Sequence, residues 1–501
     1  MTHIFSRIRY ATQTLLSAVV LLFAGATPAL ASDWKRAETH SFIVYSEGST
    51  TQLEKYARDL ERLDALLRKL WRKDPIEDPA KLTVYLLEDA QNVSALAGRD
   101  ARSGLIAGFY TARAEGSFFV GNRRRSKFAE RLTGRQVLYH EYAHHFFFQN
   151  FSVPAPAWFA EGYADFVSTA EFLPNEQWTI GKYANRHLST LAYNRSYDFG
   201  ALVSGAKPKK NASLFYAWSW ALTHYLYSQP QGSGKKITRY LADLNDGIEP
   251  EKAAANAFGD TEALAEAVRA YIKEPITYQK STEPLIYRSA VQIEELEDVP
   301  SQLVELRLQR LMNYDAKGAQ KDLEKLVDRG KANADVWSEL AILRYVRQDQ
   351  REAHDAVERA LSLDPTHTEA LVLRGRMAVE KYQQEGAEDN ALLETGLADL
   401  EAAVAAEPNN PWALTNLAQT LQMSGQQADR LGELSERAFE LAPEVVPIRF
   451  QYAFVLTAQG QYSRAIRLME IIANNPHGGG ENAEKFIESL KGLRDEYGDE
   501  N

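Results

Sequence analysis

The chain of 501 residues contains no cysteine. This absence excludes a disulfide framework, a structural zinc site closed by thiolates and a lipid-anchored cysteine. Basic residues are too few to give a positive balance, since 57 Lys and Arg stand against 68 Asp and Glu and the net charge is -11. Because phosphate binding relies on a surplus of Lys and Arg, nucleic acid is excluded as a main partner. Stability must come from ordinary hydrophobic cores, which a chain of this length can build.

Long apolar runs are also scarce, and the strongest candidate lies near the N-terminus. Arg7 and Arg9 precede the apolar run 15–23, and the Ala-Leu-Ala segment 29–31 fits the small-x-small rule for signal cleavage. We therefore expect a signal peptide over residues 1–31 and export to the periplasm or the extracellular space. The run is shorter than the roughly 18 apolar residues of a membrane span, so no stable span is expected after cleavage.

A pair of histidines with helical spacing is the most informative motif. His140 and His144 are four positions apart, and Glu141 follows the first of them. On a helix such positions lie about 5–6 Å apart on one face, so both imidazoles can bind a single ion. Glu141 lies about 100° around the helix, beside the open coordination position. His145 points away from this face and is expected to pack or to face solvent rather than to bind metal.

An acidic pair with the same spacing completes the candidate ligand set. Glu161 and Asp165 are again four positions apart. A second helix can therefore direct Glu161 to the metal and place Asp165 against the spare N–H of a ligand histidine. The alternative is an amphipathic helix with two surface histidines and an unrelated Glu-Gly turn.

This ligand set is typical of catalytic zinc. Two imidazoles and one carboxylate leave a fourth position for water, whereas structural zinc usually has four protein ligands. Bound zinc lowers the pKa of water from near 16 to about 7, and a carboxylate in the place of Glu141 can take that proton and deliver it to a leaving amine. The expected cofactor is Zn2+, and the expected reaction is hydrolysis of a peptide or protein substrate.

On these residues the chain resembles the gluzincin metallopeptidases, whose pattern is His-Glu-x-x-His with a downstream Glu. Segment 156–166 (Pro-Ala-Trp-Phe-Ala-Glu-Gly-Tyr-Ala-Asp-Phe) is similar to the peptidase MA-like group, which is often fused to tetratricopeptide repeats. The motif match covers residues 137–166. The Gly-x-Met-Glu-Asn segment of the aminopeptidase branch is absent, which puts N-terminal exopeptidase action in doubt. The resemblance implies that His140, His144 and Glu161 are zinc ligands. It also implies that Glu141 is the catalytic base and that Asp165 is the partner of His140.

Gluzincins usually supply a Tyr or His from a later helix to stabilise the developing oxyanion. Tyr216 is the first candidate for this donor and His224 the second, because both lie in the aromatic segment 215–224. Such a donor lowers the barrier by roughly 3–4 kcal/mol. The alternative is that these aromatic residues belong to the core of a helix.

A basic run is the local exception to the acidic composition. It precedes the ligand helix and comprises Arg123, Arg124, Arg125, Lys127, Arg131 and Arg135. The run is either a solvated loop or a docking site for an anionic substrate.

The order of helix and strand signals predicts an α+β, zincin-like catalytic domain over residues 32–275, with a small mixed sheet. Its strand-rich lobe, 32–122, has strand signals at 42–45 and 82–87, a helix at 51–71, and a hairpin made of 108–112 and 117–120. Its helical lobe, 123–275, has the clearest helix signals at 213–227, 236–244 and 262–272. We expect 117–120 to be an exposed edge strand that can bind an extended peptide, with an ordinary buried strand as the alternative.

The C-terminal half predicts an all-α superhelix of tetratricopeptide repeats. A polar linker is expected at 276–300, the repeats at 301–478, and a terminal helix with an acidic tail at 479–501. The clearest unit, about 34 residues long, has its signature positions filled by Trp337, Leu340, Ala341, Ala353, Val357, Ala360 and Pro365. Because one helical pair cannot bury its apolar face alone, the units must stack, and the concave side commonly holds a peptide or protein partner. The alternative role is a rigid spacer.

Two functions are compatible with this organisation. The first is an exported zinc metallopeptidase whose repeats recruit substrate or dock it in an assembly. The second is a binding scaffold in which the repeats are the function and the zincin-like module is inactive. The intact base Glu141, with its three ligands and Asp165, favours the first.

Overall fold

The computed structural model describes residues 33–499 except 100–104, 125–132, 152–154, 195–196, 206–210, 229–232, 387–388, 426–427 and 475–479. The expected signal peptide lies outside the described residues, as do Arg125, Lys127 and Arg131 of the basic run. None of the described helices is both long and apolar enough to cross a membrane.

The strands are β1 (Lys35–Glu38), β2 (Phe42–Ser46), β3 (Leu82–Leu87), β4 (Gly108–Thr111), β5 (Phe118–Asn122), β6 (Glu171–Phe172), β7 (Trp178–Ile180), β8 (Gln279–Lys280) and β9 (Gln292–Glu295). The helices that precede the repeats are α1 (Thr50–Trp71), α2 (Ala90–Leu96), α3 (Gly134–Asn150), α4 (Ala157–Val167), α5 (Asn185–Tyr193), α6 (Phe199–Val203), α7 (Ala212–Ser228), α8 (Ser233–Asn245), α9 (Pro250–Phe258) and α10 (Thr261–Tyr271). The strand signals at 42–45 and 82–87 and the helix at 51–71 are confirmed within a residue or so.

The larger sheet is mixed and has the order β4-β5-β3-β2-β1-β9. β2, β3 and β5 are parallel to one another, whereas β1, β4 and β9 run antiparallel to their neighbours. The parallel pairing of β2 and β3 requires a crossover, and the amphipathic helix α1 supplies it. A Ser49 side chain that accepts a hydrogen bond from the N–H of Gln52 caps the start of this helix.

The predicted hairpin is present, but the predicted edge strand is wrong. β5 pairs with β3 on one side and with β4 on the other, and all of its residues are buried. Because the hairpin folds outward from β5, β4 forms the edge of the sheet. The edge strand at this end is therefore Gly108–Thr111, and 117–120 belongs to the alternative, an ordinary buried strand.

Helices cover both faces of this sheet. One face packs against α1 and α3 in a core that includes Val84 and Phe119. Side chains of the other face, such as Tyr85 and Val120, pack with α2 and with Leu308 of α11, the first helix of the repeat region. The first repeat helix thus contributes to the core around the sheet, which buries β5 from both sides.

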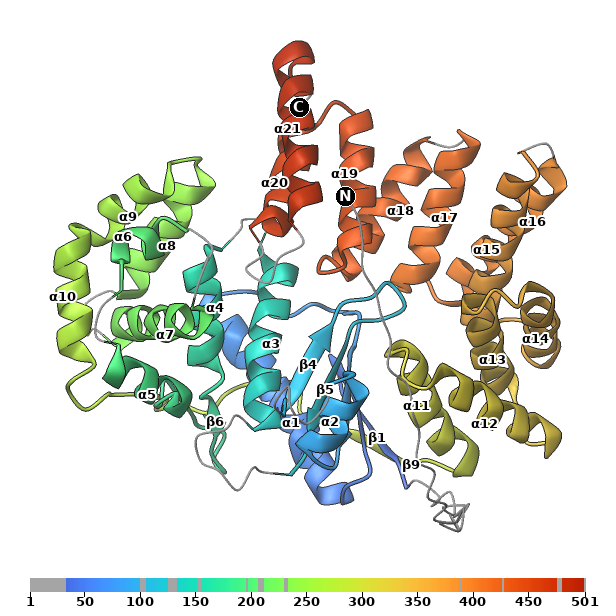
Figure 1. Cartoon of the computed structure of the whole chain (residues 1–501), viewed down its shortest axis with the longest axis horizontal. Helices are drawn as coiled ribbons and strands as arrows, with labels where there is room; N and C mark the ends of the chain where they lie inside the picture. The colour runs from blue at the N-terminus through green and yellow to red at the C-terminus, as the bar shows by residue number, and fades with distance from the viewer. Residues whose placement is uncertain are drawn as a thin grey trace, which may run out of the picture.

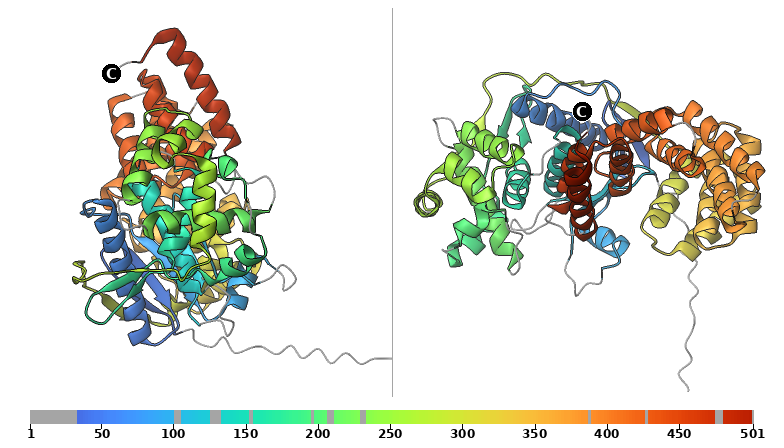
Figure 2. Two further views of the ribbon diagram at one scale, coloured as in Figure 1. Left: turned by 90° about the vertical axis from the view of Figure 1, so that its left-hand side faces the viewer. Right: turned by 90° about the horizontal axis from the view of Figure 1, so that it is seen from above.

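The C-terminal helices form antiparallel pairs. They are α11 (Asp298–Leu311), α12 (Ala316–Asp328), α13 (Ala334–Val346), α14 (Gln350–Leu363), α15 (Thr368–Gln384), α16 (Asn390–Ala406), α17 (Pro411–Ser424), α18 (Ala428–Leu441), α19 (Val446–Ala458), α20 (Tyr462–Ala473) and α21 (Glu481–Tyr497). In Figures 1 and 2 these pairs follow a curved row beside the sheet, coloured yellow to red. Small residues such as Ala341, Ala360 and Ala418 are fully buried where the helices meet. The predicted all-α repeat superhelix is confirmed.

The segment 276–300, expected to be a polar linker, contains two strands. β8 extends a small sheet of order β6-β7-β8. β9 pairs with β1 at the far edge of the larger sheet, with Glu295 opposite Lys35. The chain between the two regions is therefore integrated into both sheets.

The turn between β4 and β5 contacts the first repeat helix and the central repeats. Arg113 donates a hydrogen bond to the carbonyl oxygen of Leu311 at 2.6 Å, and Glu115 forms an ion pair with Arg310 at 3.0 Å. Ala114 packs against the core of the central repeats. In Figure 1 this turn reaches from the sheet towards the orange helices. Part of the repeat surface on which we expected a separate partner is thus occupied by the chain's own hairpin.

Candidate metal centre

Helix α3 carries the His-Glu-x-x-His motif. Its first turn is held by a capping box, in which the Thr133 hydroxyl accepts from the backbone of Gln136 and the Gln136 side chain accepts from the backbone of Thr133. The helix packs against the sheet through an apolar side that includes Tyr142 and Phe146. The motif lies in the middle of the helix, where the backbone is constrained by neighbours on both sides.

Helix α4 carries both acidic residues of the second motif. Glu161 and Asp165 are fully buried on the side of α4 that faces α3. Gly162 permits a close approach to α7, because a Cβ at this position would lie 2.3 Å from the carbonyl oxygen of Ser219. The glycine that follows the ligand glutamate in sequence is therefore a packing requirement of this helix pair.

The side chains of His140, His144 and Glu161 converge. The two histidine Nε2 atoms are 3.2 Å apart. Nε2 of His140 lies 3.4 Å from one carboxylate oxygen of Glu161, and Nε2 of His144 lies 3.7 Å from the other. Among the described residues, this is the one group of three or more His, Cys, Asp or Glu whose ligand atoms all lie within 4.8 Å of one another.

These separations fit a tetrahedral metal ion. Zinc binds imidazole nitrogen and carboxylate oxygen at about 2.0–2.2 Å, so two ligand atoms at tetrahedral angles lie roughly 3.3 Å apart. The three observed distances surround this value. Two neutral imidazoles and one carboxylate are also the borderline ligands that zinc prefers. The donor set therefore fits Zn2+ and leaves a fourth position outside the protein ligands.

Asp165 orients the first ligand. Its Oδ1 atom lies 2.7 Å from Nδ1 of His140, and its Oδ2 atom lies 2.5 Å from Nε2 of His187 on α5. The side chain of Arg186 also forms an ion pair with Asp165. When Nδ1 of His140 donates to this carboxylate, its Nε2 lone pair is directed towards His144 and Glu161.

Two residues on α5 belong to this site although the sequence analysis did not single them out. Burial lowers the pKa of His187 to about 2, with smaller contributions from Arg186 and His140, so the ring is neutral. Burial lowers the pKa of Arg186 to about 10, while Glu161, Tyr216 and Glu141 act in the opposite direction. Arg186 remains a cation near neutral pH and lies within electrostatic range of both the base and the ligand carboxylate. Neither residue follows a motif spacing. The only signal in the sequence was that a carboxylate has two oxygens, so Asp165 could bind a second partner besides His140.

Tyr216 lies near the metal cluster. It is half-buried on α7, and burial, followed by the negative charge of Glu161, raises the pKa of its hydroxyl to about 12. The hydroxyl is therefore protonated near neutral pH and can donate a hydrogen bond. This position is compatible with the predicted role of oxyanion donor.

His224 does not reach the cluster, and its prediction as the second donor is wrong. Its Nε2 atom lies 2.6 Å from the carbonyl oxygen of Gly181, and its Nδ1 atom lies 2.8 Å from the hydroxyl of Tyr271. The ring is fully buried. It lies two helical turns beyond Tyr216, and both of its nitrogens are used in the core.

His145 packs away from the metal ligands, as predicted. The ring is buried, and its Nδ1 atom lies 3.0 Å from the hydroxyl of Tyr110 on the edge strand. Burial lowers the pKa of His145, against the attraction of Glu444 in the repeats. This histidine therefore links the ligand helix to β4 and to the repeat array.

A cavity of about 470 Å3 lies beside the metal ligands. Glu141 and His144 of α3 line it together with the edge strand β4. Its opposite wall comes from the repeats and includes Val446 and Ile471. The cavity therefore lies between β4 and the repeats, with Glu141 on its wall.

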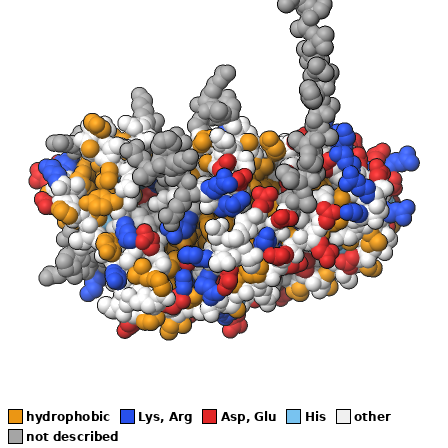
Figure 3. Space-filling view, turned by 90° about the horizontal axis from the view of Figure 1, so that it is seen from below, with side chains coloured by type: hydrophobic (Ala, Val, Ile, Leu, Met, Phe, Trp, Pro, Cys, Tyr) orange, Lys and Arg blue, Asp and Glu red, His pale blue; other side chains and the backbone are white. Residues whose placement is uncertain are grey.

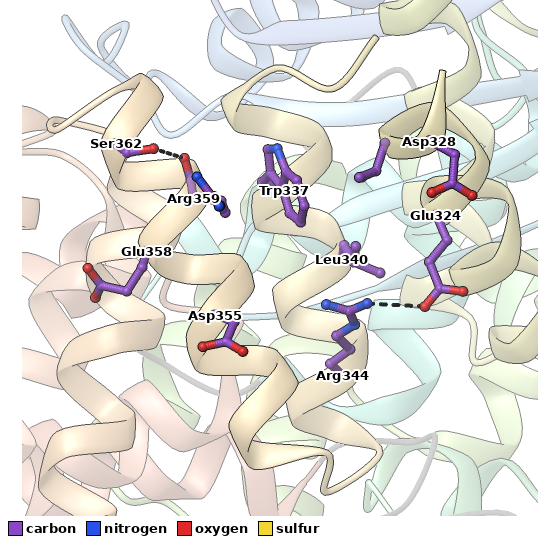
Figure 4. A pocket seen from close by; sticks show the side chains of 10 residues that line it. Glu324, Asp328, Trp337, Leu340, Arg344, Asp355, Glu358, Arg359 and Ser362 are labelled. Carbon is purple, nitrogen blue, oxygen red and sulfur yellow. Dashed lines mark hydrogen bonds and ion pairs between the residues drawn. The ribbon is translucent and has the colours of Figure 1, made fainter. Parts of the chain in front are cut away.

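A second cavity of about 760 Å3 lies wholly within the repeats, among α12, α13 and α14 (Figure 4). Trp337 stands between acidic and basic side chains there, and Arg344 pairs with Glu324 at 3.2 Å. Its charges are of both signs, so it defines no single class of ligand.

The described part of the basic run is paired or packed. Arg124 forms an ion pair with Glu88 at 2.5 Å, and Arg135 lies over the ring of Tyr139 at 5.7 Å. On the face drawn in Figure 3, Lys and Arg side chains are interspersed with Asp and Glu. These contacts concern Arg124 and Arg135, and both interpretations of the run stay predictions.

Comparison with known proteins supports the repeat region. The family model described as tetratricopeptide repeat matches residues 400–431, which span parts of α16, α17 and α18. No curated protein matches the chain.

Solved tetratricopeptide-repeat proteins resemble part of the chain. A protein of this type from Thermus thermophilus is 15% identical over 38% of this chain and 98% of its own, with a TM-score of 0.32. PilF of Pseudomonas aeruginosa is 16% identical over 39% of this chain and 90% of its own, with a TM-score of 0.30. MamA is 15% identical over 36% of this chain and 95% of its own, with a TM-score of 0.27. Scores this low support no argument about function.

Proposed function

We propose that this chain is a zinc-dependent peptidase of the gluzincin type, with a zincin-like catalytic domain fused to tetratricopeptide repeats. The observation that carries the proposal is the convergence of His140, His144 and Glu161 at 3.2–3.7 Å, with Glu141 beside them. A chance pair of surface histidines would not have a buried carboxylate between them and a second carboxylate behind one ring.

The metal would be held by His140, His144 and Glu161. When bound, zinc supplies Lewis acidity that makes water a competent nucleophile near neutral pH. Asp165 keeps the first histidine in the tautomer that binds metal. Burial of Glu161 removes water that would otherwise compete for its oxygens.

Glu141 would move the proton. It lies on the same helix as both histidines and lines the cavity that a substrate must enter. A carboxylate in this position can accept a proton from the attacking water and donate it to the leaving amine, a role worth about 100- to 10,000-fold in rate.

The substrate would lie along β4. The main chain of this edge strand is hydrogen-bonded to β5 on one side, so its other side can pair with an extended peptide. Tyr216 and Arg186 are the two donors close enough to Glu141 and Glu161 to interact with them electrostatically. They are the candidates to stabilise negative charge on the scissile carbonyl oxygen.

The second candidate function is a protein-interaction scaffold with an inactive zincin-like module. The family match at residues 400–431 favours it, because this match concerns the repeats alone. Repeats of this type commonly bind proteins. This candidate requires no metal and no hydrolysis, so one experiment separates the two functions.

The experiment compares the purified protein with its Glu141→Gln variant. Both are loaded with zinc, their bound metal is measured by elemental analysis, and both are incubated with a denatured proteome whose new termini are mapped by mass spectrometry. We expect equal zinc, cleavage by the parent and a loss of at least about 100-fold in the variant. Glu266→Gln, at an exposed position on α10, is the matched control and should cleave like the parent. Full zinc occupancy without cleavage by the parent would reject the peptidase in favour of the scaffold.

A further inference from the structure

The cavity beside the candidate metal ligands is composite, because its two walls come from regions more than 280 positions apart in the sequence. The wall on the catalytic side includes Phe147 of α3 and Phe109 of β4. The wall on the repeat side includes Val446 at the start of α19 and Ile471 near the end of α20. A substrate that reaches Glu141 therefore contacts the repeats as well as the catalytic domain.

Specific contacts hold the repeat wall in place. The hydroxyl of Ser117, just before β5, donates a hydrogen bond of 2.6 Å to Glu444, in the turn between α18 and α19. Phe148 of α3 packs against the core of α19, α20 and α21, and the guanidinium of Arg449 lies 5.8 Å from its ring centre. Arg449 is itself fully buried and donates to the carbonyl oxygens of Pro443 and Leu468. The wall is thus fixed by buried contacts.

The chemistry of the lining is apolar apart from a few polar groups. Aromatic rings from α3 and β4 face aliphatic side chains from α19 and α20. The polar groups include Glu141 and His144, which belong to the proposed reaction, and Glu444 and Asn474 on the repeat wall, where one carboxylate oxygen of Glu444 accepts from Ser117. Val446 keeps 36% of its surface exposed although it is apolar and lines the cavity. A volume of about 470 Å3 lies within the range of roughly 300–1,000 Å3 that is typical of ligand sites.

We propose that the last repeat completes the substrate site, and that Val446 and Ile471 select a large apolar side chain next to the scissile bond. This inference rests on the proposed peptidase function for the identity of the ligand. It assigns the repeats a direct part in specificity, which differs from the recruitment of a separate partner. A polar side chain packed against Val446 and Ile471 would lose its hydration, and neither aliphatic side chain could replace the lost hydrogen bonds.

The test narrows the cavity from the repeat side. Ile471→Phe and Val446→Phe each add bulk to the repeat wall at positions that are not fully buried, so the fold should be retained. Ile286→Ala, at a side chain that is 93% exposed, is the control. Each protein is given peptides that carry Gly, Val, Leu, Phe or Trp beside the scissile bond. We expect the parent to prefer Leu, Phe and Trp, and each wall variant to lose roughly 10- to 200-fold in kcat/KM for Phe and Trp while Val peptides change little.

A binding measurement separates this inference from the peptidase function. The neutral apolar fluorophore N-phenylnaphthylamine is titrated into the Glu141→Gln protein, alone and combined with each wall substitution. We expect the fluorophore to bind the Glu141→Gln protein. We expect at least 10-fold weaker binding when Glu141→Gln is combined with Val446→Phe or with Ile471→Phe. Weakened fluorophore binding without hydrolysis by any protein would reject the peptidase and retain the apolar site. Unchanged fluorophore affinity and unchanged peptide preference in both wall variants would overturn the inference, even if hydrolysis is found.

Discussion

Nδ1 of His140 on α3 lies 2.7 Å from Oδ1 of Asp165 on α4. The other nitrogen of the same imidazole, Nε2, lies 3.4 Å from a carboxylate oxygen of Glu161. His140 therefore contacts both acidic residues of α4. A ligand histidine that donates to a carboxylate has a set tautomer, a set ring orientation and a more basic coordinating nitrogen.

Replacing this carboxylate with an amide should weaken metal binding without unfolding the protein. Asp165→Asn retains the volume but removes the negative charge that His140, His187 and Arg186 share. We expect zinc affinity to fall by about 10- to 100-fold in competition with a chromogenic chelator. Asp246→Asn, at an exposed position after α8, should bind zinc like the parent. Unchanged affinity in Asp165→Asn would remove this residue from any role in the metal site.

Replacing either of the two candidate oxyanion donors should test whether it contributes to the rate of hydrolysis. Tyr216→Phe removes the hydroxyl whose pKa burial and Glu161 raise to about 12, and Arg186→Gln removes the cation on α5. We expect kcat to fall by about 100- to 1,000-fold for the residue that contacts the oxyanion, with a smaller change in KM.

The two donors can be distinguished by their effect on bound zinc. Because Arg186 also pairs with Asp165, its replacement should lower zinc affinity, whereas Tyr216→Phe should leave it unchanged. A normal kcat in both variants would mean that another group stabilises the oxyanion.

Two glycine substitutions should change stability in opposite directions. An alanine Cβ at Gly162 would lie 2.3 Å from the carbonyl oxygen of Ser219 and 2.4 Å from the hydroxyl of Thr223, so α4 must shift. We expect a loss of about 1–3 kcal/mol and weaker zinc binding, since α4 carries Glu161. At Gly492, on the exposed side of α21, nothing lies within 4 Å of a new Cβ. Alanine there should stabilise the helix by about 0.5–1 kcal/mol.

Thermal unfolding followed by tryptophan fluorescence and by circular dichroism would measure both glycine variants. If Gly162→Ala unfolded at the parent's temperature and bound zinc normally, the close approach of α4 and α7 would have no bearing on the site.

The convergence of the candidate ligands could be predicted from the sequence because each half of the set is local. His140 and His144 share a helix face by spacing alone, and Glu161 and Asp165 repeat the same spacing on the next helix. The contacts between α3 and α4 could not be derived from spacing. The glycine after Glu161 concerns another contact, since it permits the packing of α4 on α7.

The missed features depend on contacts between distant segments. Arg186 and His187 reach the site through the packing of α5 against α7, which leaves no periodic signal. The edge strand was misassigned because period-two alternation identifies a strand but does not give its place in the sheet. Glu444 and Ser117 are separated by 327 positions, so their contact could not be inferred from either local sequence.

The buried ring of His224 should make the catalytic domain sensitive to acid. Burial lowers the pKa of His224 in the folded protein, whereas an unfolded chain gives histidine a pKa of about 6.5. Below that pH the unfolded state therefore binds a proton that the folded state excludes. Stability should fall as the pH decreases, by at most about 1.4 kcal/mol per pH unit for this one group. Above about pH 6.5 both states are neutral at this residue, and the contribution is fully present.

The variant His224→Gln removes the titrating group and keeps a donor that can reach the carbonyl oxygen of Gly181. We expect its unfolding temperature to be lower than the parent's at neutral pH but to change less between about pH 7 and pH 5. His354→Gln, at an exposed position on α14, should follow the parent at both values. If the unfolding temperatures of the parent and His224→Gln changed equally with pH, the ring would gain its proton as readily in the folded state as in the unfolded chain. The core position of His224 would then not control its charge.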